Sequence, residues 1–253
     1  NDILVMGATP LTFLDYIAND RLEPQKISEI VDGMVTACRE TDVALVGGET
    51  AEMPDTYLPG EHDLVGVITG VVDRNKIITG ENIQPGDVLL GLPSNGLHTN
   101  GYSLARKVFF DINRYSVDTF LDSLGCTIGE SLLEPHINYT NHVLCTLNTN
   151  EPVKGIAHIT GGGLTENIPR ILPRGCSVNI KRGAWPNLPV FDTIEELGNI
   201  EVEEMYRAFN MGIGMVFIVD KKSVDTITKS LKNITPVFNI GTIVKGEGQT
   251  NYV

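Results

Sequence analysis

The spacing of apolar residues predicts one amphipathic helix near the start of the chain. Between Gln25 and Glu40 the apolar residues recur at intervals of three and four, which places them along one face of a helix. They are Ile27, Ile30, Val31, Met34, Val35 and Cys38. Pro24 suits a first helical turn. We therefore expect a helix over residues 25–40, with the Cys38 thiol buried on its apolar face.

Shorter apolar runs predict strands that alternate with further helices. The run Val43–Val46 ends at Gly47-Gly48, so we interpret it as a buried strand that enters a loop. Further strands are expected at residues 64–72, 87–92, 156–159 and 214–220, and further helices at 102–112, 165–172, 203–209 and 223–231. Strands alternating with helices indicate a mixed α/β fold.

A segment rich in turn residues divides the pattern into two parts. Gly80, Asn82, Pro85 and Gly86 lie between two predicted strands. We place a domain boundary near residues 80–86, which gives an N-terminal domain of residues 1–82 and a C-terminal domain of residues 83–253. A chain of 253 residues is long enough for two ordinary domains or one large one.

Charge and cysteine content narrow the classes of partner and the compartment. The net charge of −13 disfavours nucleic acid and anionic membranes as partners, but local N–H groups and Mg²⁺ still allow phosphorylated small molecules to bind. No apolar run approaches 18 residues, so no transmembrane helix is expected. The four cysteines contain no Cys-x-x-Cys pair. We therefore expect no structural zinc site, and a reducing cytoplasm.

Three glycine-containing loops are candidates for chemistry, and each has an ordinary structural alternative. In Gly47–Pro54, two glycines allow close approach of a ligand and two carboxylates, Glu49 and Glu52, offer hard oxygen ligands for Mg²⁺. A polar turn after a strand is the alternative. In Ser94–Gly101, small residues precede a predicted helix whose N-terminus suits an anion, and His98 can bond a phosphate or a carbonyl. Turn and cap formation is the alternative there.

The third loop carries the sequence His158-Ile159-Thr160-Gly161-Gly162-Gly163. Three consecutive glycines destabilise an ordered element, which favours a functional reason such as phosphate binding between a strand and a helix. A structural role for the lone histidine is the alternative. No Gly-x4-Gly-Lys-Ser/Thr motif occurs. We interpret His62, His136, His142 and Trp185 as structural, with Trp185 in a surface loop.

Five strings in order along the chain resemble the aminoimidazole ribonucleotide synthetase family. They are Asn1-Asp2-Ile3-Leu4 with Gly7-Ala8-x-Pro10-Leu11-x-Phe13-Leu14-Asp15-Tyr16, then Gly47-Gly48-Glu49-Thr50-Ala51-Glu52-Met53-Pro54, then His98-Thr99-Asn100-Gly101-Tyr102-Ser103-Leu104, then His158–Arg170, and finally Glu204-Met205-Tyr206-x-x-Phe209-Asn210-Met211-Gly212-Ile213-Gly214. The resemblance runs from residue 1 to about residue 245.

The resemblance implies a fold and a reaction. It implies a ferredoxin-like N-terminal domain that pairs with a second copy to complete a β-barrel, a C-terminal domain with helices on a mixed sheet, and an active site in the cleft between the domains. The implied reaction is the ATP-dependent closure of the imidazole ring of formylglycinamidine ribonucleotide in purine biosynthesis. ATP, Mg²⁺ and a homodimer are the expected cofactors and assembly.

The resemblance also implies roles for individual residues. Asp2 and Glu49 are expected to bind Mg²⁺ and phosphate, and Asn1, Glu52, Gly47 and Gly48 to bind nucleotide or phosphate. His158 is the expected catalytic residue. His98, Asn100, Thr160 and the glycines Gly161, Gly162 and Gly163 are expected to bind substrate.

Two departures from the family pattern alter these expectations. A glycine-rich segment bearing Asp and Lys, expected before Asn1, is absent, so we expect this chain to be N-terminally truncated. In addition, Glu134-Pro135-His136-Ile137-Asn138-Tyr139 stands where the family has Pro-Thr-Lys/Arg-Ile-Tyr, so an expected basic residue is missing. The alternatives are another ATP-using member of the superfamily, such as a selenophosphate synthetase or a thiamine-monophosphate kinase, and a non-catalytic fragment.

Overall fold

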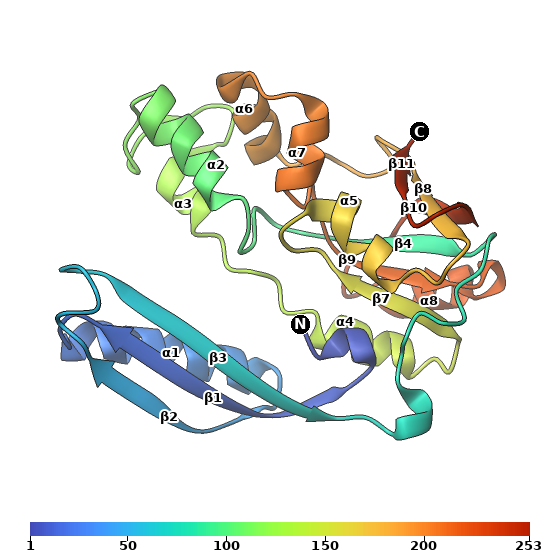
Figure 1. Ribbon diagram of the computed structural model, residues 1–253, viewed down its shortest axis with the longest axis horizontal. Helices are drawn as coiled ribbons and strands as arrows, with labels where there is room; N and C mark the ends of the chain where they lie inside the picture. Colours follow the sequence, from blue (N-terminus) through green and yellow to red (C-terminus); the bar gives the residue numbers. More distant parts are fainter. The chain divides into compact units, whose positions relative to one another are not determined.

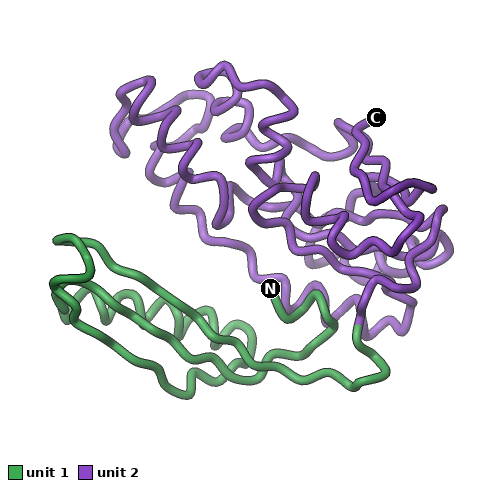
Figure 2. Tube along the Cα trace, viewed as in Figure 1, with its two compact units in different colours: residues 1–77 green, residues 78–253 purple.

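The computed structural model describes residues 1–253 and divides them into two compact units, Asn1–Ile77 and Ile78–Val253 (Figure 2). Each unit has its own sheet, and together they confirm the mixed α/β class. None of the helices is both long enough and apolar enough to cross a membrane.

Unit 1 is a three-stranded sheet with one long helix. Its elements are η1 (Leu4–Met6), β1 (Thr9–Asn19), α1 (Pro24–Glu40), β2 (Ala44–Glu52), β3 (His62–Val71) and η2 (Arg74–Lys76). The strand order is β2-β1-β3, with β1 parallel to β2 and antiparallel to β3. Helix α1 makes the crossover between the two parallel strands. The predicted helix is confirmed, and Cys38 is buried on it.

The expected loop at Gly47-Gly48 is wrong, because both glycines lie inside β2. The strand continues to Glu52, and the register with β1 shifts between Phe13 and Leu14, which leaves Val46 as an extra residue in β2. This bulge carries the strand past the glycines. Gly48 is required at its place because a Cβ there would collide with the carbonyl and carboxylate of Asp15.

Unit 2 is built on a six-stranded mixed sheet of order β11-β8-β10-β4-β9-β7. The strands are β4 (Val88–Pro93), β7 (Val153–His158), β8 (Cys176–Ile180), β9 (Ile213–Val219), β10 (Phe238–Lys245) and β11 (Thr250–Tyr252), with a small hairpin of β5 (Phe120–Leu121) and β6 (Cys126–Thr127). The helices are α2 (Tyr102–Arg106), the π-helix η3 (Lys107–Ile112), α3 (Ile128–Leu132), α4 (Thr140–Leu147), α5 (Gly163–Asn167), η4 (Pro169–Ile171), α6 (Pro189–Gly198), α7 (Val202–Ala208), η5 (Lys221–Ser223) and α8 (Val224–Leu231).

Helices cover both faces of this sheet. Helices α2, α3, α6 and α7 lie on one side, and α4 and α8 lie on the other (Figure 1). Side chains of β9 alternate accordingly: Val216 and Ile218 join the main core cluster, whereas Phe217 and Val219 are buried outside it. A fully buried central strand of this kind explains the continuous apolar run at residues 213–219.

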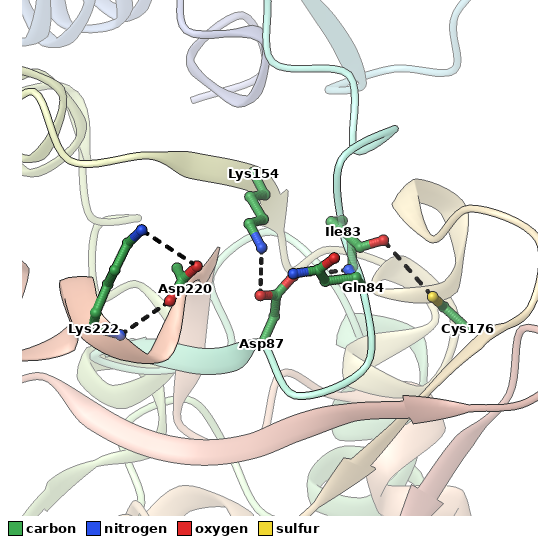
Figure 3. A network of polar contacts seen from close by, with 7 residues as sticks. All are labelled: Ile83, Gln84, Asp87, Lys154, Cys176, Asp220 and Lys222. Atoms are coloured by element: carbon green, nitrogen blue, oxygen red, sulfur yellow. Dashed lines mark hydrogen bonds and ion pairs between the residues drawn. The ribbon is translucent and has the colours of Figure 1, made fainter.

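Polar contacts fix the edge strand β7 and correct one sequence interpretation. Lys154 of β7 pairs with Asp87, just before β4, at 2.5 Å, and both side chains are largely buried (Figure 3). The other carboxylate oxygen of Asp87 accepts a bond from the Gln84 N–H at 2.8 Å. Trp185 was expected in a surface loop; instead it is buried, and its Nε1 donates to the Met211 carbonyl at 2.7 Å.

Candidate functional site

In unit 1 the candidate residues are spread along β1 and β2. Glu49 is exposed in β2 and pairs with Tyr16 of β1. Glu52 ends the strand, and its carboxylate accepts a bond from the Leu22 N–H at 2.8 Å, so part of its role is to hold the turn that leads to α1. Asn1 and Asp2 lie before η1, in the segment that leads to the start of β1.

The register of unit 1 separates Asp2 from Glu49. Ile3, the neighbour of Asp2, approaches Gly70, and Gly70 pairs with Pro10. Glu49 pairs with Tyr16, six residues further along β1, and six extended residues span about 20 Å. Glu49 thus lies well along β1 from the Gly70–Pro10 pair that Ile3 approaches. No group of three or more His, Cys, Asp or Glu side chains gathers in a way that could hold a metal ion.

In unit 2 the residues predicted from the sequence lie close together at the carboxyl ends of two strands, and we call this border of the sheet its edge. Strands β4 and β7 are both antiparallel to β9, so they are parallel to each other and their carboxyl ends meet at the same edge. The loop after β4 carries His98 and Asn100, and β7 ends at His158, followed by Thr160 and the three glycines. This edge is the usual place for a ligand in sheets with parallel strands.

The triple-glycine loop is held by one buried side chain. The Asn167 amide donates to the carbonyls of Gly163 at 2.8 Å, Gly161 at 3.1 Å and Thr160 at 3.3 Å. The Thr160 hydroxyl donates back to Asn167 Oδ1 at 3.2 Å. Gly162 and Gly163 have φ of +93° and +56°, and a Cβ on Gly163 would collide with the Tyr206 carbonyl, which explains why glycine is needed there.

The loop leaves backbone donors available. Among its N–H groups, that of Gly163 donates to the Thr160 carbonyl at 3.0 Å, whereas those of Gly161 and Gly162 donate to no protein acceptor. Asn100 extends toward Gly161, with its Oδ1 3.2 Å from where a Cβ of that glycine would lie. Two available amides suit an anionic oxygen, whereas the Asn100 Oδ1 beside them can only accept hydrogen bonds.

The loop after β4 is held by Asn210, which sequence reasoning did not single out. Its side chain is 3% exposed, accepts from the Ser94 hydroxyl at 2.7 Å and from the Gly212 N–H at 2.8 Å, and donates to the Gly96 carbonyl at 2.8 Å. Asn210 was present in the fifth family string, but its role depends on contacts more than a hundred residues away along the chain. No local pattern reveals such a contact.

The third feature of this edge is a row of imidazole rings. His136, which we interpreted as structural, lies between His98 and His158: its ring stacks on His98 with centroids 4.0 Å apart, and its Nε2 lies 3.1 Å from Nε2 of His158. His98 itself is 4% exposed. Burial, reinforced by the nearby rings of His136 and His158, lowers the pKa of His98 from 6.5 to about 3, so this ring is neutral near pH 7.

Tyr139 and Gly214 complete the setting of His98. The Tyr139 hydroxyl donates to the Pro93 carbonyl at 2.7 Å, and burial raises the pKa of this phenol. Gly214 in β9 has no side chain, and a Cβ there would collide with the Tyr139 hydroxyl and lie 2.7 Å from His98 Cε1. Gly214, the last residue of the fifth string, is therefore what lets the two rings approach the sheet.

Sequence comparisons cover nearly the whole chain. Family models for the AIR synthase related protein match residues 1–72 with the N-terminal domain and residues 84–253 with the C-terminal domain. Phosphoribosylformylglycinamidine cyclo-ligase of Geobacillus thermodenitrificans is 47% identical over 249 residues, which is 98% of this chain and 72% of that protein. The enzyme of the same name from Caldanaerobacter subterraneus is 49% identical over 98% of this chain and 74% of its own length.

Solved structures with lower identity share the fold. The hydrogenase maturation protein HypE of E. coli matches with a TM-score of 0.71 at 20% identity, over 100% of this chain and 72% of that one. Thiamine-monophosphate kinase from Stenotrophomonas maltophilia matches with a TM-score of 0.73 at 17% identity, over 99% and 74%. By its two matched domains and its close relatives, the chain belongs to the phosphoribosylformylglycinamidine cyclo-ligase family, whose members are C–N bond-forming ligases of purine biosynthesis.

Proposed function

We propose that the chain catalyses the ATP-dependent cyclisation of formylglycinamidine ribonucleotide to aminoimidazole ribonucleotide, with release of ADP and phosphate. The observation that carries this proposal is the 47–49% identity with cyclo-ligases over 98% of the chain. The reaction needs the formyl amide oxygen to become a good leaving group, which phosphorylation by ATP achieves. The amidine nitrogen then attacks that carbon, phosphate departs, and one proton is released as the ring closes.

The edge of the unit 2 sheet suits the substrate side of this reaction. The free N–H groups of Gly161 and Gly162 can bind the oxygens of a phosphate, and the Asn100 Oδ1 beside them can accept a hydrogen bond from a substrate N–H or hydroxyl. His158 and Thr160 lie at the start of the same loop. Ring closure is intramolecular, so holding the substrate in a bent conformation supplies much of the rate acceleration.

We also propose that unit 1 binds the nucleotide, and that this nucleotide is ATP, the phosphoryl donor. One structure of the same fold, with a TM-score of 0.71, is of HypE in complex with ATP, and another, with a TM-score of 0.66, is of AaThiL complexed with AMPPCP and TMP. Asn1, Asp2, Glu49 and Glu52 with Gly47 and Gly48 are the proposed contacts. Because Asp2 and Glu49 lie toward opposite ends of β1, each can bind Mg²⁺ only with phosphate oxygens and water as most of its ligands.

We also propose that two copies pair through the open face of the unit 1 sheet. Leu14 of β1 pairs with Val67 of β3, and Val65 and Val71 share that face of β3. Their side chains are 42–57% exposed, which is unusual for three aligned valines and a leucine in a sheet. A second copy is the proposed cover.

The four free cysteines fit our further proposal of a cytoplasmic location.

Product analysis tests the proposed reaction. The whole protein is incubated with ATP and Mg²⁺, with and without formylglycinamidine ribonucleotide, and ADP and the aminoimidazole product are measured. ADP formation that requires this substrate and matches the aminoimidazole in amount is expected. ADP formation that ignores it but responds to thiamine monophosphate or selenide would show another member of the superfamily, and no turnover with any of them would show a non-catalytic chain.

A carboxylate variant tests the nucleotide side. Glu49→Gln keeps the size of the side chain but removes its charge, so Mg²⁺-dependent turnover should fall by about a hundredfold or more. Glu61→Gln, at an exposed site before β3, is the matched control and should keep turnover near that of the parent. Turnover of Glu49→Gln within about threefold of the control would remove Glu49 from the metal and phosphate site.

A further inference from the structure

The hydrogen bonds around the row of imidazole rings in unit 2 indicate which ring nitrogens carry a proton. Asn95 donates through Nδ2 to the Glu134 carboxylate at 3.0 Å and to the Pro135 carbonyl at 2.9 Å. These two bonds fix the orientation of the amide, so Asn95 Oδ1, 2.8 Å from His98 Nε2, accepts a hydrogen bond from that nitrogen. The Asn95 N–H approaches the same nitrogen only at 3.5 Å, so the shorter contact with Oδ1 places the His98 proton on Nε2.

His98 then offers a flat, neutral surface to the next ring. Its Nδ1 is buried and has no hydrogen-bond partner, and burial keeps the ring uncharged. His136 stacks on it with an angle of 20° between the ring planes. The His136 Nδ1 lies 3.4 Å from the Thr99 hydroxyl, which also accepts a bond from the Asn100 amide at 3.3 Å. The ring of His136 is thus held on its face and at one edge.

The other edge of His136 faces His158. Two Nε2 atoms 3.1 Å apart form a hydrogen bond only if one carries a proton and the other does not. If both were protonated there, two N–H groups would point at each other. The contact therefore holds one proton between the two rings.

We propose that His136 is a positioning residue for His158, fixing the orientation of its ring and the location of its ring proton through the Nε2–Nε2 hydrogen bond. This inference rests on the proposed function, in which His158 lies at the substrate loop. It gives a role to the histidine that departs from the family pattern in the Glu134–Tyr139 segment. The stack on His98 and the bond to Thr99 explain how His136 is itself held.

Two substitutions separate the ring of His136 from its hydrogen bond. His136→Phe keeps an aromatic ring against His98 but has no atom that bonds His158, whereas His136→Gln keeps an amide that can. In the whole protein, kcat should fall about tenfold or more in His136→Phe with KM nearly unchanged, and His136→Gln should recover most of that loss. A kcat for His136→Phe within about twofold of the parent, or equal losses in the two variants, would overturn the proposal.

A readout independent of turnover is the ¹⁵N NMR of the histidine rings. In the parent, the ¹⁵N signal of one Nε2 in the His136–His158 pair should be that of a protonated nitrogen, and the signal of the other should be that of an unprotonated nitrogen. The His158 signals should change in His136→Phe and persist in His136→Gln; signals that are the same in all three proteins contradict the proposal. A pair whose signals change on treatment with a chelator binds a metal instead, which also contradicts it. If the parent forms no aminoimidazole, the proposed function fails while these spectra still decide the pairing.

Discussion

At the scale of the residue, His98 shows how burial converts a titratable group into a neutral one. Its ring is enclosed by Tyr139, His136 and the loop that Asn95 anchors, and its backbone has a φ of +59°. The unfolded chain binds a proton at this histidine below about pH 6.5, but the folded protein does so only below about 3. Between these values the unfolded state holds more protons, so stability decreases as the pH falls.

His98→Asn tests this consequence. Asparagine tolerates a positive φ and does not titrate in this range, so the variant loses the histidine's contribution to acid sensitivity. The free energy of unfolding of the parent, measured by urea denaturation from pH 7 to pH 4, should fall more steeply than that of His98→Asn. Parallel curves would show that His98 is accessible to protons in the folded state.

The glycines of the third loop offer a matched pair of substitutions. Gly163→Ala places a Cβ against the Tyr206 and Phe209 carbonyls at a φ of +56°, so it should lower the free energy of unfolding by about 2 kcal/mol or more. Gly161→Ala meets only the Asn100 side chain, at 3.2 Å, and should cost less than about 1 kcal/mol. Equal effects in urea denaturation would mean that the loop adjusts freely.

At the scale of the element, the ion pair of Lys154 and Asp87 ties the edge strand β7 to the segment before β4. Lys154→Met leaves a carboxylate that is 3% exposed without its cation, and should lower the free energy of unfolding by about 3–5 kcal/mol. Lys222→Met removes a pair with an N–O distance of 3.9 Å at a lysine that is 74% exposed, and should change it by less than about 1 kcal/mol (Figure 3). Both variants are measured by thermal and urea denaturation. Similar losses of stability in the two variants would show that burial does not distinguish the two ion pairs.

The elements that the sequence predicted correctly are those with a local pattern. The period of α1 and the apolar runs of β4 and β9 place their elements to within a few residues. β1 was not recognised, although it is the central strand of unit 1, because its apolar residues are interrupted by Thr12 and Asp15 and its pairing partners lie far away along the chain. The continuation of β2 through Gly47-Gly48 depends on a bulge that only the pairing with β1 reveals.

In the candidate site, too, features with a local sequence pattern were predicted, whereas contacts between residues far apart in the chain were not. Glycines and histidines identified the loops of unit 2, and family strings supplied their order. The contacts that give those loops their shape could not be predicted, because Asn210 reaches back to Ser94 and His136 reaches forward to His158 across 116 and 22 residues. A lone histidine carries no information on its neighbours until the sheet brings the loops together.

At the scale of the whole molecule, the open face of unit 1 decides the proposed assembly. Val67→Lys places a charge in the middle of this face, where Val67 is 52% exposed, and should increase the dissociation constant of the dimer by about a hundredfold or more. Leu133→Lys, at a residue of unit 2 that is 80% exposed, is the control. Sedimentation equilibrium measures both; an unchanged dimer in Val67→Lys, or a monomeric parent, would contradict pairing through this face.

The open face of unit 1 lies in the part of the chain that is synthesised first, so it is exposed before synthesis ends. Unit 1 ends at Ile77, so its strands and helix can form while the 176 residues from Ile78 to Val253 are still being synthesised. At about 5–20 residues per second, that interval lasts roughly 10–35 s. During it Val65, Val67 and Val71 meet solvent on a ribosome-bound chain, and neighbouring nascent chains on one messenger RNA present the same surface. Pairing through this face, as proposed, would then begin between nascent chains, and the amount of dimer formed would depend on how densely ribosomes are loaded.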